Sequence, residues 1–192
     1  MTEGISRFDV PALEDLPHDI RERIESVQEK SGFVPNVFIV LARRPDEFRA
    51  FFDYHDALML KDSDLSKAER EMIVVATSAA NDCSYCVVAH GAILRIYAKD
   101  PYISDQLAAN YRDAPVSARQ RAMLDFAVKL ARTPERTSDE DLANLKAHGF
   151  DDESIWDIGA IASFFALSNR MAHLTRMRPN AEFYGMGRGS RD

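Results

Sequence analysis

The sequence predicts an all-α protein built as a multi-helix bundle. Apolar residues recur every three or four positions along much of the chain, which is the spacing of one helix face. Two capping boxes, Ser66 with Glu69 and Ser117 with Gln120, mark helix starts, because each pair exchanges side-chain and backbone hydrogen bonds. No stretch is a convincing strand, and the chain contains neither a Gly-rich phosphate loop nor a dinucleotide-binding fingerprint.

The chain of 192 residues is long enough for one domain with a substantial core, so residues 1–192 are expected to form a single domain. Pro11 and Pro17 push the residues before them toward extended conformations, which predicts an N-terminal arm over residues 1–17. This arm either packs on a surface through its apolar residues or stays partly disordered. Residues 179–192 are expected to form a C-terminal tail that is loose or draped over a partner subunit.

Composition and charge restrict the classes of function. Hydrophobic residues make up 46% and charged residues 29%, which is ordinary for a soluble globular protein. The net charge of −7 argues against general nucleic-acid binding. No apolar run approaches the roughly 20 residues of a membrane span, and the acidic N-terminus lacks the apolar core of a signal peptide. Two cysteines without a disulfide framework suit a reducing compartment, so we predict a cytoplasmic protein with no membrane partner.

Three helices are expected before the cysteines. The first covers residues 19–31, with Gly32 as its stop. The apolar segment 37–42 is short enough to be a buried strand, but its helical neighbours favour a helix. Pro45 suits the first turn of a third helix over residues 45–60, on which His55 is expected to be structural rather than catalytic.

Two further helices are expected around the cysteines. The first covers residues 66–80, and Asn81 and Asp82 interrupt it because their side chains compete for backbone hydrogen bonds. Asp82 is predicted to be the N-cap of the second helix, over residues 83–98.

The last third of the chain is also helical by pattern. A short helix is expected before Tyr111, another starts at Ser117, and a short one between Ser138 and Gly149 precedes a long helix over residues 152–175. Apolar residues occupy much of the circumference of this long helix, which predicts either the central helix or an oligomer interface.

Three polar residues interrupt the apolar surface of the long helix: Asn169, Arg170 and His173. We expect them to form a structural hydrogen-bond set. The alternative is that Arg170 pairs with a buried carboxylate.

Four reactive side chains lie close together in the sequence: Glu71, Cys83, Cys86 and His90. On one helix, Cys86 lies about 60° and His90 about 20° from Cys83, so the three share a face. An i,i+3 cysteine pair in the first turn can form a disulfide, and the helix start stabilises a thiolate. His90 can exchange a proton with Cys86, and Glu71 faces the cysteines if the two helices pack antiparallel. This pattern predicts a redox or metal-binding role.

The spacing of these residues is specific. Eleven residues separate Glu71 from Cys83, two separate Cys83 from Cys86, and three separate Cys86 from His90. This spacing resembles the signature of the alkyl hydroperoxidase D (AhpD)-like group in the carboxymuconolactone decarboxylase superfamily. The resemblance covers roughly residues 20–185 and implies an AhpD-like multi-helix bundle. The segments that look like the longer, peroxidase-related branch of the group are residues 32–36, 65–67 and 169–172.

The resemblance implies a thiol-dependent peroxidase that reduces small organic hydroperoxides without a cofactor. In the implied cycle Cys86 is the peroxidatic thiolate, Cys83 resolves the sulfenic acid into a disulfide, and Glu71 and His90 relay protons. The helix-start effect by itself favours Cys83 as the lower-pKa thiol, so the order of attack stays open. The best-studied members of the group carry a histidine where this chain has Tyr85. A phenol with a pKa of about 10 cannot replace an imidazole as a relay, and Tyr85 is expected to line a pocket.

The same resemblance implies a homo-oligomer whose electron donor is a lipoyl-bearing or thioredoxin-like protein. Three other functions stay open. The four reactive side chains could bind a metal such as zinc. The chain could be a carbon-acid enzyme like the decarboxylases of the superfamily, although that branch generally lacks the cysteines. It could also be a non-enzymatic redox sensor.

Overall fold

The computed structural model describes residues 4–189, and within them the protein is all-α, as predicted. The α-helices are α1 (His18–Ser31), α2 (Asn36–Leu41), α3 (Pro45–Met59), α4 (Lys67–Ala80), α5 (Ser84–Ala98), α6 (Ile103–Asn110), α7 (Ala118–Arg132), α8 (Asp139–Ala147) and α9 (Asp152–Thr175). Short 3-10 helices are η1 (Leu13–Asp15), η2 (Pro134–Arg136) and η3 (Ala181–Tyr184).

Local sequence signals place most of these helices. Gly32 ends α1 in a left-handed conformation with φ of +83°, which costs glycine little because it has no Cβ. The ambiguous apolar segment is the helix α2. Both predicted capping boxes are present at the starts of α4 and α7. His55 on α3 contacts Asp56, with 3.0 Å between Nδ1 and Oδ1.

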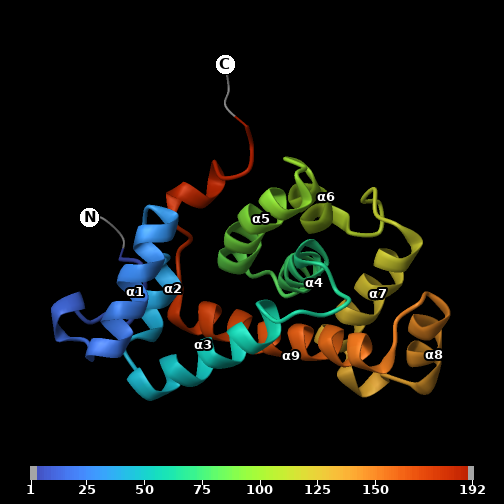
Figure 1. The fold of residues 1–192 in the computed structure, drawn as a ribbon, viewed down its shortest axis with the longest axis horizontal. Coiled ribbons are helices and arrows are strands. Elements are labelled where there is room, and N and C mark those ends of the chain that lie inside the picture. Colours follow the sequence, from blue (N-terminus) through green and yellow to red (C-terminus); the bar gives the residue numbers. More distant parts are fainter. Residues whose placement is uncertain (1–3, 190–192) are drawn as a thin grey trace.

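Helix α4 is the centre of the bundle. It packs against α5, α6, α7 and α9, which surround it in Figure 1. Its residues 69–78 are all buried, and the apolar side chains among them form the middle of the main core. Burial of one large aliphatic side chain stabilises the fold by about 1.5–3 kcal/mol. The helix that carries Glu71 is therefore held firmly in place.

Helix α9 packs on α4 and α7 and also contacts α3, α5 and α8, which accounts for much of its wide apolar surface. The central position belongs to α4 instead. Apolar side chains of α9 remain exposed at Trp156, Leu167 and Leu174. An oligomer interface on α9 therefore stays a prediction. Among residues 4–189, no helix combines the length and the apolar character needed to cross a membrane.

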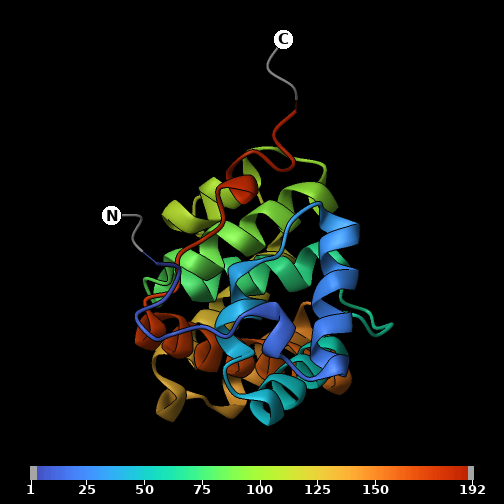
Figure 2. The same ribbon diagram turned by 90° about the vertical axis from the view of Figure 1, so that its left-hand side faces the viewer.

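The two terminal segments lie side by side on one face of the molecule (Figure 2). The backbone N–H of Arg7 donates to the carbonyl of Thr175 at 2.8 Å, and the N–H of Arg178 donates to Ile5 at 3.1 Å. The predicted arm thus packs on its own chain.

The C-terminal tail is not loose over residues 179–189, because that segment packs on α5 of the same chain, and a contact of this tail with a partner subunit stays a prediction. The guanidinium of Arg95 donates to the carbonyls of Phe183 and Met186, both at 2.8 Å. Arg188 forms two hydrogen bonds of 2.8 Å with the carboxylate of Asp105 at the start of α6. Residues 190–192 of the predicted tail, like residues 1–3 of the arm, lie outside the described part of the chain.

Candidate active site

A tight turn between α4 and α5 positions the two cysteines. Asp82 adopts a left-handed conformation with φ of +54°, and its N–H donates to the carbonyl of Ala79 at 3.0 Å. The N–H of Cys83 reaches back to Ser78 at 2.9 Å. These two bonds form a Schellman motif, the usual way to satisfy the last carbonyls of a helix.

The prediction that Asp82 is the N-cap of the second helix is therefore wrong. Asp82 ends α4, and Cys83 itself is the N-cap residue of α5, whose first helical residue is Ser84. Asp82 takes this role because an aspartate tolerates the left-handed conformation that the turn requires. Cys86 then lies at the third helical position, so both sulfur atoms stay at the positive end of α5.

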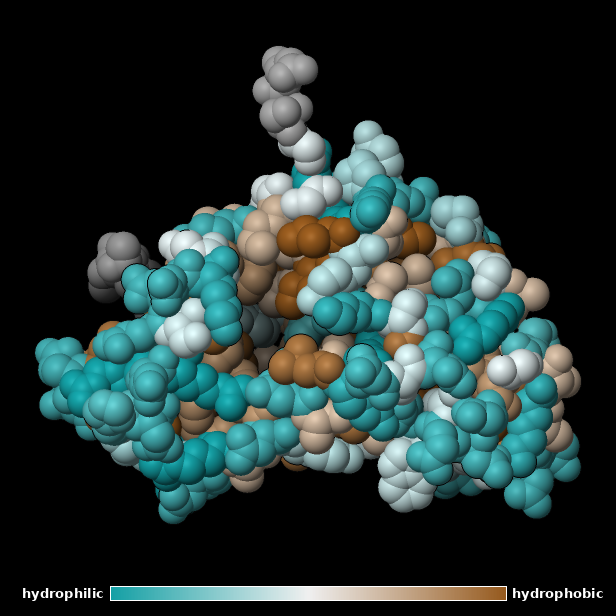
Figure 3. Space-filling model, in the orientation of Figure 1, coloured by the Kyte–Doolittle hydropathy of each residue, from teal (hydrophilic) through white to brown (hydrophobic). Residues whose placement is uncertain are grey.

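Both cysteines are free thiols buried in the protein, with exposed fractions of 2% for Cys83 and 1% for Cys86. Apolar side chains from distant segments surround them, among them Val40 of α2, Ala172 of α9 and Phe183 of η3. On the surface, the molecule is hollowed between α2 and the start of α5 (Figure 3). Apolar side chains thus separate the thiols from solvent near this hollow.

The pKa values of the two thiols are shifted in opposite directions. A hydrogen bond from the Cys86 side chain, helped by the backbone N–H of Cys86, the charge of His173 and the amide of Asn169, lowers the pKa of Cys83 to about 6, against the effect of burial. The same hydrogen bond raises the pKa of Cys86 well above its ordinary value, and burial adds to this. Near neutral pH the pair therefore holds one thiolate, on Cys83, which the thiol of Cys86 stabilises.

Helix α9 contributes polar groups beside the thiols that sequence reasoning did not assign to the site. Ser168 places its Oγ 3.8 Å from the sulfur of Cys86. The buried amide of Asn169 donates to the Ser78 hydroxyl at 2.9 Å and accepts from Asn81 Nδ2 at 2.9 Å. These bonds aim Asn169 at the turn that carries the cysteines, and its polarity on an apolar helix was the signal that could have identified it.

The other two polar residues of α9 point outward. His173 places Nε2 3.0 Å from the carbonyl oxygen of Asn81, in the turn between α4 and α5 that carries Cys83. This position explains why His173 lowers the pKa of Cys83. Arg170 donates to the carbonyl of Ala166 at 2.6 Å and is exposed, so it does not pair with a buried carboxylate. The predicted structural hydrogen-bond set is confirmed for Asn169 and His173.

Glu71 and His90 form a buried pair between α4 and α5. Glu71 Oε2 lies 2.7 Å from His90 Nδ1, and the side chains are only 6% and 14% exposed. The carboxylate fixes the proton on Nδ1, which leaves Nε2 as the nitrogen available for proton transfer. The edge of Phe165 packs against the imidazole, with ring centroids 4.7 Å apart. Within residues 4–189, no hydrogen bond joins His90 to a thiol.

Tyr85 belongs to the apolar cluster around the cysteines, and its hydroxyl reaches α2. Its hydroxyl accepts a hydrogen bond of 3.1 Å from the backbone N–H of Val37, and the side chain is buried. Burial raises the pKa of Tyr85 above its ordinary range. The phenol therefore connects α5 to the first turn of α2, and its expected role in lining a substrate pocket stays a prediction.

The described residues show no group of three or more His, Cys, Asp or Glu side chains arranged to hold a metal ion. Glu71 and His90 pair with each other, while the cysteines face Ser168 and Asn169 of α9. This arrangement does not support the alternative of a zinc site.

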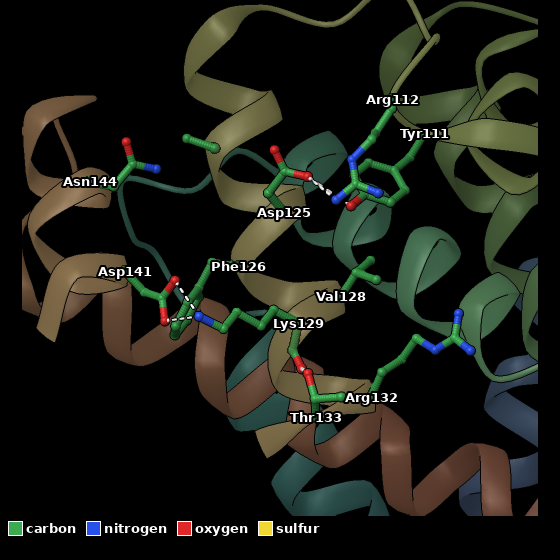
Figure 4. A pocket seen from close by; sticks show the side chains of 11 residues that line it. Tyr111, Arg112, Asp125, Phe126, Val128, Lys129, Arg132, Thr133, Asp141 and Asn144 are labelled. Carbon is green, nitrogen blue, oxygen red and sulfur yellow. Dashed lines mark hydrogen bonds and ion pairs between the residues drawn. The ribbon is translucent and has the colours of Figure 1, made fainter. Parts of the chain in front are cut away.

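A pocket of about 510 Å³ lies along α7 and contains none of the predicted site residues (Figure 4). Four of its five charged side chains form ion pairs, and Arg132 is the exception, with no ion pair among residues 4–189. Arg112 lies 3.0 Å from Asp125, and Lys129 lies 2.6 Å from Asp141. The thiol pair on α5 is therefore the better candidate for chemistry.

Comparisons with known proteins identify the family of the chain. Residues 45–100 match the model of the carboxymuconolactone decarboxylase family. A search of the curated proteins found no match. A peroxidase-related protein with an AhpD core from Ralstonia eutropha JMP134 is 63% identical, with a TM-score of 0.97, over 99% of this chain and 100% of that one. A peroxidase-related protein from Silicibacter sp. TM1040 is 44% identical, with a TM-score of 0.92, over 97% of each chain.

A third solved structure is more distant. It is a putative antioxidant defence protein AhpD from Agrobacterium tumefaciens, 25% identical with a TM-score of 0.63, over 73% of this chain and 95% of that one. The two more similar structures align with nearly the whole chain. The chain therefore belongs to the AhpD-like group of the carboxymuconolactone decarboxylase family.

Proposed function

We propose that the protein is a thiol-dependent peroxidase that reduces small organic hydroperoxides through a dithiol–disulfide cycle. The observation that carries this proposal is the buried cysteine pair at the start of α5, in which Cys83 is the more acidic thiol and Cys86 the less acidic one. A thiolate that exists near neutral pH is a nucleophile toward peroxides, and an adjacent thiol is what resolves the sulfenic acid that results.

The chemical balance of the oxidative half is simple. The thiolate of Cys83 attacks one peroxide oxygen, the O–O bond breaks, and the alkoxide leaves as an alcohol after taking up a proton. The sulfenic acid on Cys83 then reacts with the thiol of Cys86, which forms the disulfide and releases water. One hydroperoxide and two thiols thus yield one alcohol, one water and one disulfide.

The low pKa of Cys83 supports this order of attack, which is the reverse of the roles that the family resemblance implies. In the reverse order, Cys86 would have to lose its proton first, although burial and the neighbouring Cys83 raise its pKa. The resemblance and the electrostatics of the site therefore make different predictions for single cysteine variants.

The Glu71–His90 pair is proposed to move the protons. The Glu71 carboxylate holds the imidazole in one tautomer with Nε2 free, and His90 lies one helical turn after Cys86. A general base in this place would accept the Cys86 proton as the disulfide forms, or return a proton to the leaving alkoxide.

The cycle closes when a second dithiol reduces the disulfide by thiol–disulfide exchange. A lipoyl-bearing or thioredoxin-like protein is proposed as this reductant, in a cytoplasmic homo-oligomer. A reducing compartment would keep Cys83 and Cys86 ready for the next peroxide.

The decisive experiment counts thiols and peroxide together. The protein is reduced without oxygen, tert-butyl hydroperoxide is added, and both are followed in the parent, in Cys83→Ser and in Cys86→Ser. We expect the parent to lose one peroxide and two thiols per chain. Cys86→Ser should trap a sulfenic acid on Cys83, detected by mass spectrometry after reaction with dimedone.

Other outcomes separate the alternatives. A sulfenic acid that forms only in Cys83→Ser would restore the roles implied by the resemblance. Oxidation that stops after one disulfide, even with dihydrolipoamide present, would favour a redox sensor. Thiols that stay intact while peroxide persists would contradict the proposal, and carbon-acid substrates would be tested next.

A further inference from the structure

A groove between α2, α3 and the second half of α9 plays no part in the thiol chemistry described so far. It encloses about 640 Å³, within the roughly 300–1,000 Å³ that is usual for small-molecule sites. Its walls are mainly aromatic and aliphatic, with Phe51 and Phe164 packed at 4.7 Å between ring centroids. The shape and the lining are therefore those of a site for an apolar molecule.

The groove is open to water at several large apolar side chains. Phe8 is 40% exposed, Tyr54 50%, and Leu167 and Leu174 52% each, and all four line the groove. Single exposed hydrophobic residues are common on proteins, but a cluster around one concave surface indicates a binding site.

The rim of the groove carries positive charge. Arg43 donates to the backbone carbonyl of Asp9 at 2.9 Å, and its guanidinium lies 5.5 Å from the ring centroid of Phe8. No carboxylate among residues 4–189 pairs with Arg43. Arg44 beside it pairs with Glu47 at 2.9 Å, so these three side chains together carry one uncompensated positive charge. An exposed guanidinium beside an apolar groove complements a carboxylate attached to a hydrocarbon chain.

The groove borders the thiol pair. Val40 lines the groove and also belongs to the apolar cluster around Cys83 and Cys86. On α9, Leu167 lines the groove while its neighbour Ser168 contacts Cys86. The groove and the surroundings of the thiols thus share Val40 and use adjacent positions of α9.

We propose that this groove binds an aliphatic carboxylate, with its chain along α3 and α9 and its carboxylate at Arg43. If the protein is the peroxidase proposed above, the groove would hold the hydrocarbon part of its substrate, a long-chain fatty acid hydroperoxide. This assignment of the substrate rests on the proposed function. The alternative occupant of an apolar face is a second copy of the chain. The uncompensated charge at the rim favours the anion.

The binding test uses dodecanoate and dodecan-1-ol as probes, in titration calorimetry with the full-length reduced protein. We expect dodecanoate to bind once per chain. Leu167→Asp should weaken the binding of dodecanoate at least about tenfold. The new carboxylate would have to lose water beside the hydrocarbon chain of the ligand, and it would repel the carboxylate of the ligand. Arg43→Gln should weaken dodecanoate about tenfold and leave dodecan-1-ol unchanged. Leu60→Asp, at another exposed leucine outside the groove, is the matched control and should change neither.

The proposal is wrong if dodecanoate does not bind, or if Leu167→Asp and Leu60→Asp bind it equally. It is also wrong if light scattering shows a dimer that Leu167→Asp dissociates while dodecanoate has no effect, because the groove is then an interface between copies. Thiol oxidation by tert-butyl hydroperoxide tests the chemistry separately from the groove. If the protein has both the thiol chemistry and the binding groove, a fatty acid hydroperoxide should oxidise the parent faster than tert-butyl hydroperoxide does. This preference should be smaller in Leu167→Asp than in Leu60→Asp.

Discussion

The sulfur atoms of Cys83 and Cys86, three residues apart at the start of α5, differ in acidity because different groups face them. Cys83 receives a hydrogen bond from Cys86 and feels the charge of His173, whereas Cys86 faces the Cys83 sulfur and the hydroxyl of Ser168. A helix start would favour any thiolate there, but these neighbours decide which sulfur carries the charge.

The pKa of Cys83 should depend on Cys86. Replacing Cys86 with Ala removes the largest cause of the lowered pKa, so the midpoint for alkylation of Cys83 should rise from about 6 toward the ordinary range of a thiol. At pH 7 the alkylation rate should fall roughly tenfold or more. In the parent protein the thiolate, and with it the rate of peroxide attack, should decline as the pH drops through about 6. The measurement is iodoacetamide labelling against pH, and an unchanged midpoint would contradict the assignment.

Glu71→Gln should slow the cycle without displacing the thiols. The amide can still hydrogen-bond to His90 but no longer stabilises an imidazolium, so proton transfer becomes slower. We expect stopped-flow traces of thiol oxidation to slow at least about tenfold, with the alkylation midpoint of Cys83 unchanged. Glu22→Gln, at an exposed position of α1, is the control. Equal rates in the two variants would remove Glu71 from the relay.

At the scale of elements, the hairpin of α4 and α5 places the reactive groups and α2 supports it. The Schellman turn at Asp82 fixes where α5 begins, and the Glu71–His90 pair links the two helices farther along. Tyr85 extends this arrangement to α2, because its hydroxyl satisfies the backbone N–H of Val37 at the first turn of that helix.

Tyr85→Phe separates a structural role from a chemical one. Removal of the hydroxyl leaves the Val37 N–H without its partner, which should lower the free energy of unfolding by about 1–2 kcal/mol. Because no hydrogen bond among residues 4–189 joins the phenol to Glu71 or His90, peroxide-driven thiol oxidation should keep its rate. Tyr97→Phe, on an exposed side chain of α5, should change neither quantity in chemical denaturation and stopped-flow assays. A large loss of rate with unchanged stability would make Tyr85 part of the chemistry.

At the scale of the whole molecule, segments from both ends of the chain cover a helix from its middle. Ile5 of the arm and Phe183 and Met186 of the tail belong to the apolar cluster around the thiols, and Arg95 on α5 holds the tail by two carbonyls. Access to the buried cysteines therefore depends on how tightly the C-terminal segment packs.

Gly187→Ala tests this dependence. A Cβ at Gly187, where φ is +72°, would lie 2.8 Å from Cβ of Arg95 and 3.2 Å from the backbone nitrogen of Ile96, so the tail would have to move. We expect faster amide exchange in residues 181–188 and several-fold faster alkylation of the thiols at a fixed pH. Gly189→Ala is the matched control, since φ there is +70° but nothing lies within 4 Å of an added Cβ. Identical labelling of both variants would show that the tail does not limit access.

Local information in the sequence was sufficient for most of the fold. The capping boxes at Ser66 and Ser117 and the stop at Gly32 depend on hydrogen bonds and backbone preferences within a few residues, so they are visible without a tertiary structure. The placement of His90 one turn after Cys86 on α5 follows in the same way from helical spacing.

Only the tertiary structure decided how these parts meet. Ser168 and Asn169 come to the thiols from more than 80 residues away, and Glu71 faces His90 because of how α4 packs on α5. The left-handed Asp82 and the docked tail depend likewise on contacts between segments. The chain by itself thus determined that Cys86 and His90 lie one turn apart on the same helix. The folded structure determined which of the two sulfurs is acidic, because that pKa depends first on the hydrogen bond between the thiols, and then on burial and on partners from α9.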